Sequence, residues 1–171
     1  MANKKSQTLL FLALYNLLQK KDYEEISIKE LCEKANVSRM SFYRSFSSKD
    51  DILIGYCDEA FEDFFTSFLK VDNPSGYDLI LAILTFWNKN KRQIKTLQKA
   101  HKIDLLMPQF SSYTRYILSK LDTTELQYIK KNPLTVPVIS SAAFAVLLYW
   151  LESDFKYSPV EMANYVLHLY D

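Results

Sequence analysis

Glycine and cysteine are both scarce in this chain. Only Gly55 and Gly76 occur among its 171 residues, whereas glycine makes up about 7% of an average protein. This scarcity argues against folds built from strands and tight turns, and against the glycine-rich loops that hold phosphates. The two cysteines, Cys32 and Cys57, are too few for a disulfide framework or a zinc site. We therefore expect buried free thiols and no metal or cofactor.

Patterns for catalysis, export and membrane insertion are missing as well. The two histidines, His101 and His168, lie far apart in the sequence, and no nucleophile elbow, HExxH or ExxH pattern occurs. We therefore predict that the protein is not an enzyme. The first residues do not form an export signal. The apolar stretch 136–151 is too short, and too soon followed by charge, to span a membrane, so we expect a cytoplasmic protein.

What the chain does contain is a large apolar and aromatic fraction. Hydrophobic residues make up 49% of it, including 11 Phe, 12 Tyr and 2 Trp, which is enough for a sizeable core and argues against disorder. Apolar residues recur at helical spacing, which predicts an all-α protein. The net charge is only +1, but residues 1–50 contain nine Lys or Arg against six Asp or Glu. A mildly basic N-terminal part fits a module that binds nucleic acid.

Residues 27–44 carry the most specific pattern. Ser27 is a good helix N-cap, and Glu30 three residues later completes a capping box. Asn36 stands where the chain must reverse, because Asn enters the left-handed conformation at modest cost. Ser38 can then cap a second helix. A capped helix, a turn and a second capped helix form the helix-turn-helix signature.

The second helix of this motif is polar and basic. Phe42 and Phe46 lie four positions apart and can face inward. The residues left to contact DNA are Ser38, Arg39, Met40, Ser41, Tyr43 and Arg44. Arginine can bond guanine edges, and serine and tyrosine can reach phosphates. Ser48 caps a further helix, whose N-terminal N–H groups form a phosphate site to which Lys49 adds a charge. The alternative is that these are ordinary solvated residues of a small helical bundle.

Several short sequence blocks follow one another in a recognisable order. They are an aromatic residue at Tyr23, the block 27–35, Asn36, Val37-Ser38, the block 42–46 and Lys49-Asp50. In this order and spacing, residues 9–60 resemble the N-terminal domain of TetR/AcrR-family transcriptional regulators. The family usually has glycine where this chain has Asn36, and Asn tolerates the same backbone. The resemblance implies that Tyr43 and Lys49 hold phosphates, while Arg39, Met40, Ser41 and Arg44 lie at or near bases.

The loop and turn residues of the sequence predict three parts: a helix-turn-helix domain at residues 1–47, a connecting helix at 48–70, and a helical domain at 71–171. The resemblance to the TetR/AcrR family implies that this last part is the regulatory and dimerisation domain. Proline should bend the helix predicted for 103–121 near Pro108, and Pro137 should lie in a loop. The other helices are expected at 5–20, 48–69, 77–88, 89–102, 122–131, 138–155 and 158–170.

The helix expected at 138–155 is apolar on nearly every side, so it should be buried all round. A symmetric second copy is the easiest source of the second wall, with two helices from each copy forming a four-helix interface. The residues expected there are Phe144, Leu147, Leu148, Trp150, Leu151, Ala163, Val166, Leu167 and Tyr170. The alternative is an ordinary core helix in a monomer.

Aromatic residues of the C-terminal part are candidates for the walls of a pocket that takes a flat or apolar effector. The candidates are Phe61, Phe64, Phe65, Phe86, Trp87, Phe110, Tyr113, Tyr116 and Phe144; the alternative is that they are ordinary core residues. The sequence thus predicts a homodimeric transcriptional repressor that a ligand releases from a pseudo-palindromic operator in double-stranded DNA. The alternative is a helical interaction module or coactivator that keeps this fold with weak or no DNA binding.

Overall fold

A computed structural model describes residues 2–72, 74–120 and 131–168. Over these ranges every regular element is a helix, so the prediction of an all-α protein is confirmed. The chain divides into two compact units, and each is described here by itself. The first comprises Met1–Asp63 and Lys95–Ile103, and the second comprises Phe64–Ile94 and Asp104–Asp171.

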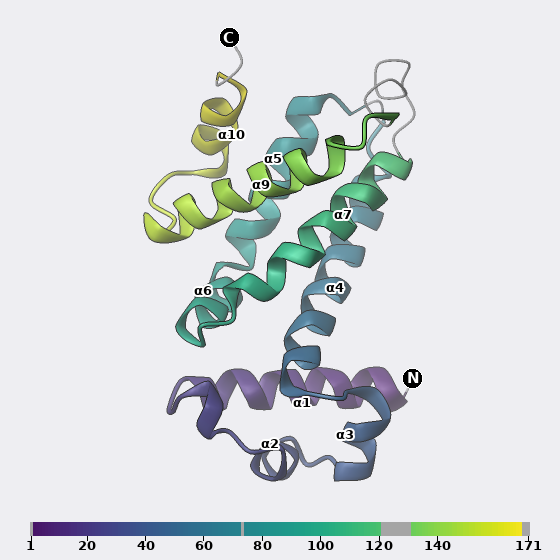
Figure 1. The fold of residues 1–171 in the computed structure, drawn as a ribbon, viewed down its shortest axis with the longest axis vertical. Coiled ribbons are helices and arrows are strands. Elements are labelled where there is room, and N and C mark those ends of the chain that lie inside the picture. Colours follow the sequence, from purple (N-terminus) through teal and green to yellow (C-terminus); the bar gives the residue numbers. More distant parts are fainter. Residues whose placement is uncertain (1, 73, 121–130, 169–171) are drawn as a thin grey trace. The chain divides into compact units, whose positions relative to one another are not determined.

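The first unit is built on α1 (Ala2–Leu18), which packs against α2 (Ile28–Ala35) and α3 (Arg39–Ser45) (Figure 1). The short helix η1 (Tyr23–Glu25) leads into α2, and α4 (Lys49–Phe68) follows α3. Leu10 and Leu14 of α1 are fully buried in the core of this unit. Burial of one leucine side chain stabilises a fold by about 1.5–3 kcal/mol. The fully buried side chains of this unit include Leu10, Leu14, Ile26, Leu31, Phe42 and Ile52.

The second unit contains α5 (Gly76–Lys89), α7 (Leu106–Lys120), α9 (Thr135–Glu152) and α10 (Pro159–Leu167). Helix α7 packs against α9, and α10 packs against α5 (Figure 1). Capping boxes start α5 at Ser75 and α10 at Ser158. The start of α10 agrees with the helix expected from residue 158. Helix α6 (Lys91–Lys99) has residues in both units.

Two prolines do not act as the sequence analysis expected. Pro108 and Pro137 are each the third residue of a helix, α7 and α9, rather than a bend or a loop residue. The first N–H groups of a helix have no intrahelical partner, so a proline there removes no hydrogen bond. Helix α9 therefore begins three residues earlier than predicted. A short 3-10 helix, η2 (Ile103–Leu105), precedes α7. The helix predicted for 122–131 falls almost wholly outside the described residues.

The compact units differ from the predicted domains in two respects. The predicted connecting segment 48–70 is divided between the units after Asp63. Residues 95–103 group with the N-terminal unit, although they belong to the segment that the sequence analysis assigned to the regulatory domain. The boundaries predicted at 47 and 70 remain predictions.

Candidate nucleic-acid interface

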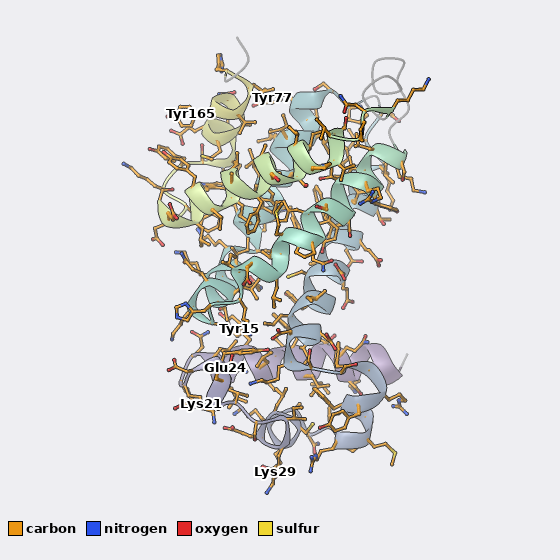
Figure 2. All side chains as sticks on the ribbon, viewed as in Figure 1. Tyr15, Lys21, Glu24, Lys29, Tyr77 and Tyr165 are labelled. Atoms are coloured by element: carbon orange, nitrogen blue, oxygen red, sulfur yellow. The ribbon has the colours of Figure 1, made fainter. Side chains whose placement is uncertain are left out.

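The turn between α2 and α3 has the geometry that its residues predict. The hydroxyl of Ser27 accepts the backbone N–H of Glu30 at 3.1 Å. Asn36 ends α2 in the left-handed region, with φ 52° and ψ 45°, and its N–H donates to the carbonyls of Cys32 and Glu33. Only the serine half of the predicted capping box is formed, because the Glu30 carboxylate accepts the Lys21 ammonium at 2.5 Å (Figure 2 labels Lys21). This geometry fixes how the chain leaves α2 and enters α3.

Helix α3 presents a polar outer face. Ser38 caps it by accepting the N–H of Ser41 at 3.1 Å. Phe42 is fully buried and Phe46 nearly so, as predicted, and these two rings anchor the helix in the unit. Six residues at this helix were predicted to contact DNA. One of them, Ser41, is half-buried. The other five are exposed: Ser38, Arg39, Met40, Tyr43 and Arg44.

Met40 and Tyr43 are apolar or aromatic side chains that this fold leaves in solvent. Met40 is 82% exposed and Tyr43 is 54% exposed. The Tyr43 ring lies edge-on to the buried Phe42 ring at 5.1 Å, which limits its orientations while its hydroxyl end stays outside. Their spacing of three residues places Met40 and Tyr43 side by side on the outer face of α3, where both are available to contact another molecule.

Lys49 has a different environment from the one the sequence analysis expected. Its ammonium donates to the backbone carbonyls of Tyr23 at 2.6 Å and Ile26 at 2.8 Å. It also lies 4.2 Å from the centre of the Tyr23 ring. Burial lowers the pKa of this ammonium, while the Glu24 carboxylate opposes that shift. The phosphate contact predicted for Lys49 remains a prediction, and in this geometry the side chain holds backbone instead.

The first turn of α4 is also engaged within the protein. The carboxylate of Asp51 accepts the N–H groups of Ser47 at 2.7 Å and Ser48 at 2.9 Å. The Ser48 hydroxyl in turn accepts the N–H of Asp51 at 3.2 Å. A carboxylate of the chain therefore bonds two of the N–H groups at this helix start, where the sequence analysis expected a phosphate.

The predicted ligand-binding aromatic residues pack on one another. Phe61 belongs to the first unit and the other eight belong to the second. In the second unit the ring centres of Phe64 and Phe86 are 4.8 Å apart, and those of Phe65 and Tyr116 are 5.3 Å apart. Two further ring pairs, Trp87–Phe110 and Phe110–Phe144, have centre distances of 5.3 and 5.4 Å. Tyr113 is half-buried. These contacts fit the core alternative, and a ligand site among them remains a prediction.

The predicted dimer residues divide by exposure. Leu147, Trp150, Leu151 and Ala163 are buried inside the chain, with 4% exposure or less. Phe144, Leu148, Val166 and Leu167 are half-buried, and Tyr170 lies outside the described residues. Large apolar residues that were not predicted for the interface are exposed on or beside α9 and α10. They are Leu134, Val138, Ile139, Tyr149, Val160 and Tyr165.

The sequence analysis missed these exposed residues because α9 is apolar on every side. Its periodicity therefore gives no signal for which face turns inward. Only 22% of the α9 window is buried, although its mean hydropathy is 1.5. That hydropathy and its 18 residues make α9 a candidate for crossing a membrane by length and composition alone. Eighteen helical residues span about 27 Å, slightly less than a bilayer core of about 30 Å, and α9 packs against α7.

Comparisons with known proteins agree with this geometry. The family model for "Bacterial regulatory proteins, tetR family" matches residues 11–55, and the model for "Transcriptional regulator C-terminal region" matches residues 75–171. The chain is 23% identical over 161 residues to "Uncharacterized HTH-type transcriptional regulator YxbF" from Bacillus subtilis (strain 168). That match covers 91% of this chain but only 41% of the Bacillus protein, so the chain spans less than half of that relative's length.

A solved structure has the same fold. The crystal structure of a TetR transcriptional regulator from Streptococcus agalactiae 2603V superposes with a TM-score of 0.63. The alignment covers 98% of this chain and 94% of the other, at 20% sequence identity. The two family models together cover both the helix-turn-helix and the C-terminal helices described above. The chain therefore belongs to the TetR family of bacterial transcriptional regulators.

Proposed function

We propose that this protein is a homodimeric, sequence-specific repressor that binds a pseudo-palindromic operator and is released from it by a ligand. The observation that carries this proposal is the outer face of α3, where a buried Phe42 fixes a helix whose side chains at positions 39, 40, 43 and 44 are exposed to solvent. Such a helix fits the major groove of DNA, which is about 12 Å wide. A DNA-binding regulator of this kind works in the cytoplasm, where bacterial DNA lies.

Each exposed side chain of α3 has a role in this proposal. Arg39 and Met40 are the first two residues of the helix, and residues at this end of a recognition helix meet base edges. Arg39 and Arg44 supply donors that bond guanine, and Met40 supplies an apolar contact for a thymine methyl group. Tyr43 supplies a hydroxyl for a phosphate oxygen.

The apolar faces of α9 and α10 support the dimer. Val138, Ala142, Ala145 and Tyr149 are spaced four, three and four residues apart, so they form one outward stripe along α9. Val160 and Tyr165 add exposed apolar area on α10. A second copy that covers this stripe would bury it by a C2 contact, because the same surface would meet itself. We propose this stripe in place of the buried residues that the sequence analysis chose.

Release by a ligand rests on the aromatic cluster of the second unit. Its ring pairs include half-buried Phe64, Phe86 and Phe144 beside buried Trp87 and Phe110. A flat apolar ligand that separates such rings would change how their helices pack, and rigid-body shifts of helices are a common route for ligand-driven switching. The regulatory and dimerisation role proposed for residues 71–171 follows from this arrangement.

A second function is favoured by one observation. Lys49 and the N–H groups of Ser47 and Ser48 are bonded within the chain, so two phosphate-binding features expected at α4 are engaged. A coactivator or interaction module of this fold would not need these groups to bind DNA phosphates. This alternative predicts little salt dependence in any DNA binding, because few phosphate contacts would release counterions.

The test is selection of DNA fragments from the source genome by the purified protein, with an R39A/Y43A variant as the control. The repressor proposal predicts a few enriched pseudo-palindromic fragments for the intact protein and none for the variant. Binding of an enriched fragment should weaken steeply with salt, with a slope of about −0.9 in log K per phosphate contact. No enrichment by a folded protein, with and without cell extract, would favour the interaction module.

A further inference from the structure

A tyrosine of the first unit lies between two lysines from distant parts of the chain. Tyr23 is only 4% exposed. The Lys49 ammonium lies 4.2 Å from the centre of its ring, and the Lys102 ammonium lies 4.7 Å from it. Both ammonium groups are close enough for attraction to the ring electrons. The Tyr23 hydroxyl donates a short hydrogen bond to the carboxylate of Asp50.

Lys102 also forms two ion pairs. Its ammonium lies 3.6 Å from a carboxylate oxygen of Glu24 and 3.6 Å from one of Asp50. The pair with Asp50 is partly shielded from water, because the two side chains are 23% and 34% exposed, whereas the Glu24 side chain is 82% exposed. The backbone N–H of Lys102 donates to the carbonyl of Leu97 in α6 at 2.9 Å, across the left-handed residue His101. This turn therefore fixes the backbone of Lys102 relative to the end of α6.

This cluster, formed by Tyr23, Glu24, Lys49, Asp50 and Lys102, holds the recognition motif at both of its ends. Lys49 bonds the carbonyls of Tyr23 and Ile26, and the residue after Ile26 is Ser27, the N-cap of α2. Lys49 and Asp50 are themselves the first residues of α4. One set of contacts thus fixes where α2 begins and where α4 begins, and α3 lies between these two points in the chain.

We propose that Lys102 is a positioning residue for DNA binding, which holds the helix-turn-helix in its binding arrangement from the end of α6 without contacting DNA. This inference rests on the proposed function. Two acidic neighbours and an aromatic face satisfy the Lys102 ammonium inside the protein, which leaves it poorly placed to act on a phosphate.

The experiment compares K102M, which keeps the chain length of the side chain and removes its charge, with K102R and with K99M. Lys99 is the last residue of α6 and is exposed, so K99M removes a nearby charge of the same sign. Affinity for a selected genomic fragment is measured at several salt concentrations. We expect K102M to weaken binding about tenfold, which corresponds to about 1.4 kcal/mol, because it loses two ion pairs and the contact with the Tyr23 ring. We expect K102R and K99M to bind with nearly the affinity of the parent.

The salt slope separates positioning from direct contact. A positioning residue leaves the slope of log K against log salt unchanged, whereas loss of a phosphate contact lowers its magnitude by about 0.9. The proposal would be overturned if K102M bound the fragment as tightly as the parent, or if the magnitude of its salt slope fell by about 0.9. Thermal unfolding of each variant checks that weaker binding does not come from an unfolded protein.

Amide hydrogen exchange gives a readout that needs no DNA. The N–H groups of Glu25 and Ile26 donate to the carbonyls of Asp22 and Tyr23, beside the ring that Lys102 contacts. K102M should speed exchange at these amides, with little change at Phe42 in α3. If the parent selects no DNA, the proposed function fails. Faster exchange in K102M would still support the positioning of the motif by Lys102, and unchanged exchange would overturn it.

Discussion

Asp51 and Ser48 cap each other at the start of α4. The Asp51 carboxylate accepts the Ser48 N–H at 2.9 Å, and the Ser48 hydroxyl accepts the Asp51 N–H at 3.2 Å. The same carboxylate accepts the Ser47 N–H at 2.7 Å. This reciprocal pair ends the segment that follows the recognition helix and so fixes where α4 begins.

The pair makes stability depend on pH. Burial raises the pKa of Asp51, but the hydrogen bonds from Ser47 and Ser48 outweigh it and hold the pKa below its usual range. The charged form is therefore favoured by folding. Its contribution is present above the unfolded pKa of about 3.9 and is lost as the pH falls through the lower folded pKa. The urea midpoint should fall less steeply below about pH 4 in D51N than in the parent. If the urea midpoints of D51N and the parent fell equally steeply below about pH 4, Asp51 would not make stability depend on pH.

Asn36 is a second site where one backbone angle decides the outcome. Its φ of 52° is in the left-handed region, where a residue with a Cβ costs about 1–2 kcal/mol. We expect N36A to lower the free energy of unfolding by about 1 kcal/mol, and N36G to leave it near the parent value because glycine adopts this angle freely. Urea unfolding measures both. A glycine variant as unstable as the alanine variant would mean that the Asn side chain, rather than the angle, matters.

The cysteines should be chemically quiet in the folded protein. Burial, with a smaller effect from Asp58, raises the pKa of the Cys57 thiol to about 12, and burial also raises the pKa of Cys32. Reaction with a thiol reagent needs the thiolate, so both should react slowly at neutral pH and quickly in urea. Mass spectrometry after timed labelling checks this. Cys32 is buried, as expected, whereas Cys57 is half-buried. Labelling of Cys57 in the native state at the rate of a free thiol would contradict its raised pKa.

The exposed stripe on α9 should control assembly. Val138 is 61% exposed in the single chain, and V138D would place a charge at one end of the stripe proposed to form the interface. We expect V138D to be a folded monomer when the parent is a dimer, as measured by light scattering. The matched control is L12D in the first unit, where Leu12 is 48% exposed, and it should remain a dimer. A dimeric V138D protein, or a monomeric parent, would remove α9 from the proposed interface.

The recognition motif could be predicted from the sequence because its signals are local. Ser27, Asn36 and Ser38 each act on backbone groups a few residues away, so spacing alone identifies them. Lys49 could not be placed this way, since its partners Tyr23 and Ile26 are 26 and 23 residues distant. A long side chain at a helix start can turn outward to a phosphate or inward to a carbonyl, and only the packed fold decides.

The exposed face of α9 could not be predicted from the sequence. Helix α9 has apolar residues on all sides, so hydrophobic periodicity did not separate core residues such as Trp150 from exposed ones such as Tyr149. The structure separates them through partners: the Trp150 ring nitrogen donates to the Tyr157 carbonyl at 3.0 Å, inside the turn to α10. The sequence predicted a helix bend at Pro108 and a loop at Pro137, whereas both lie in the first turn of a helix. A proline is compatible with all three places, so the residue type alone does not distinguish them.

The proposed function requires that the outer face of α3 reads DNA. The most direct measurement is the affinity of one selected genomic fragment for the parent, R39A and M40A, together with the melting temperature of each. Both side chains are exposed, so the account predicts unchanged melting temperatures and affinities reduced by about tenfold or more, the cost of about 1–3 kcal/mol for a lost base contact. Variants that bind the fragment as tightly as the parent would contradict it.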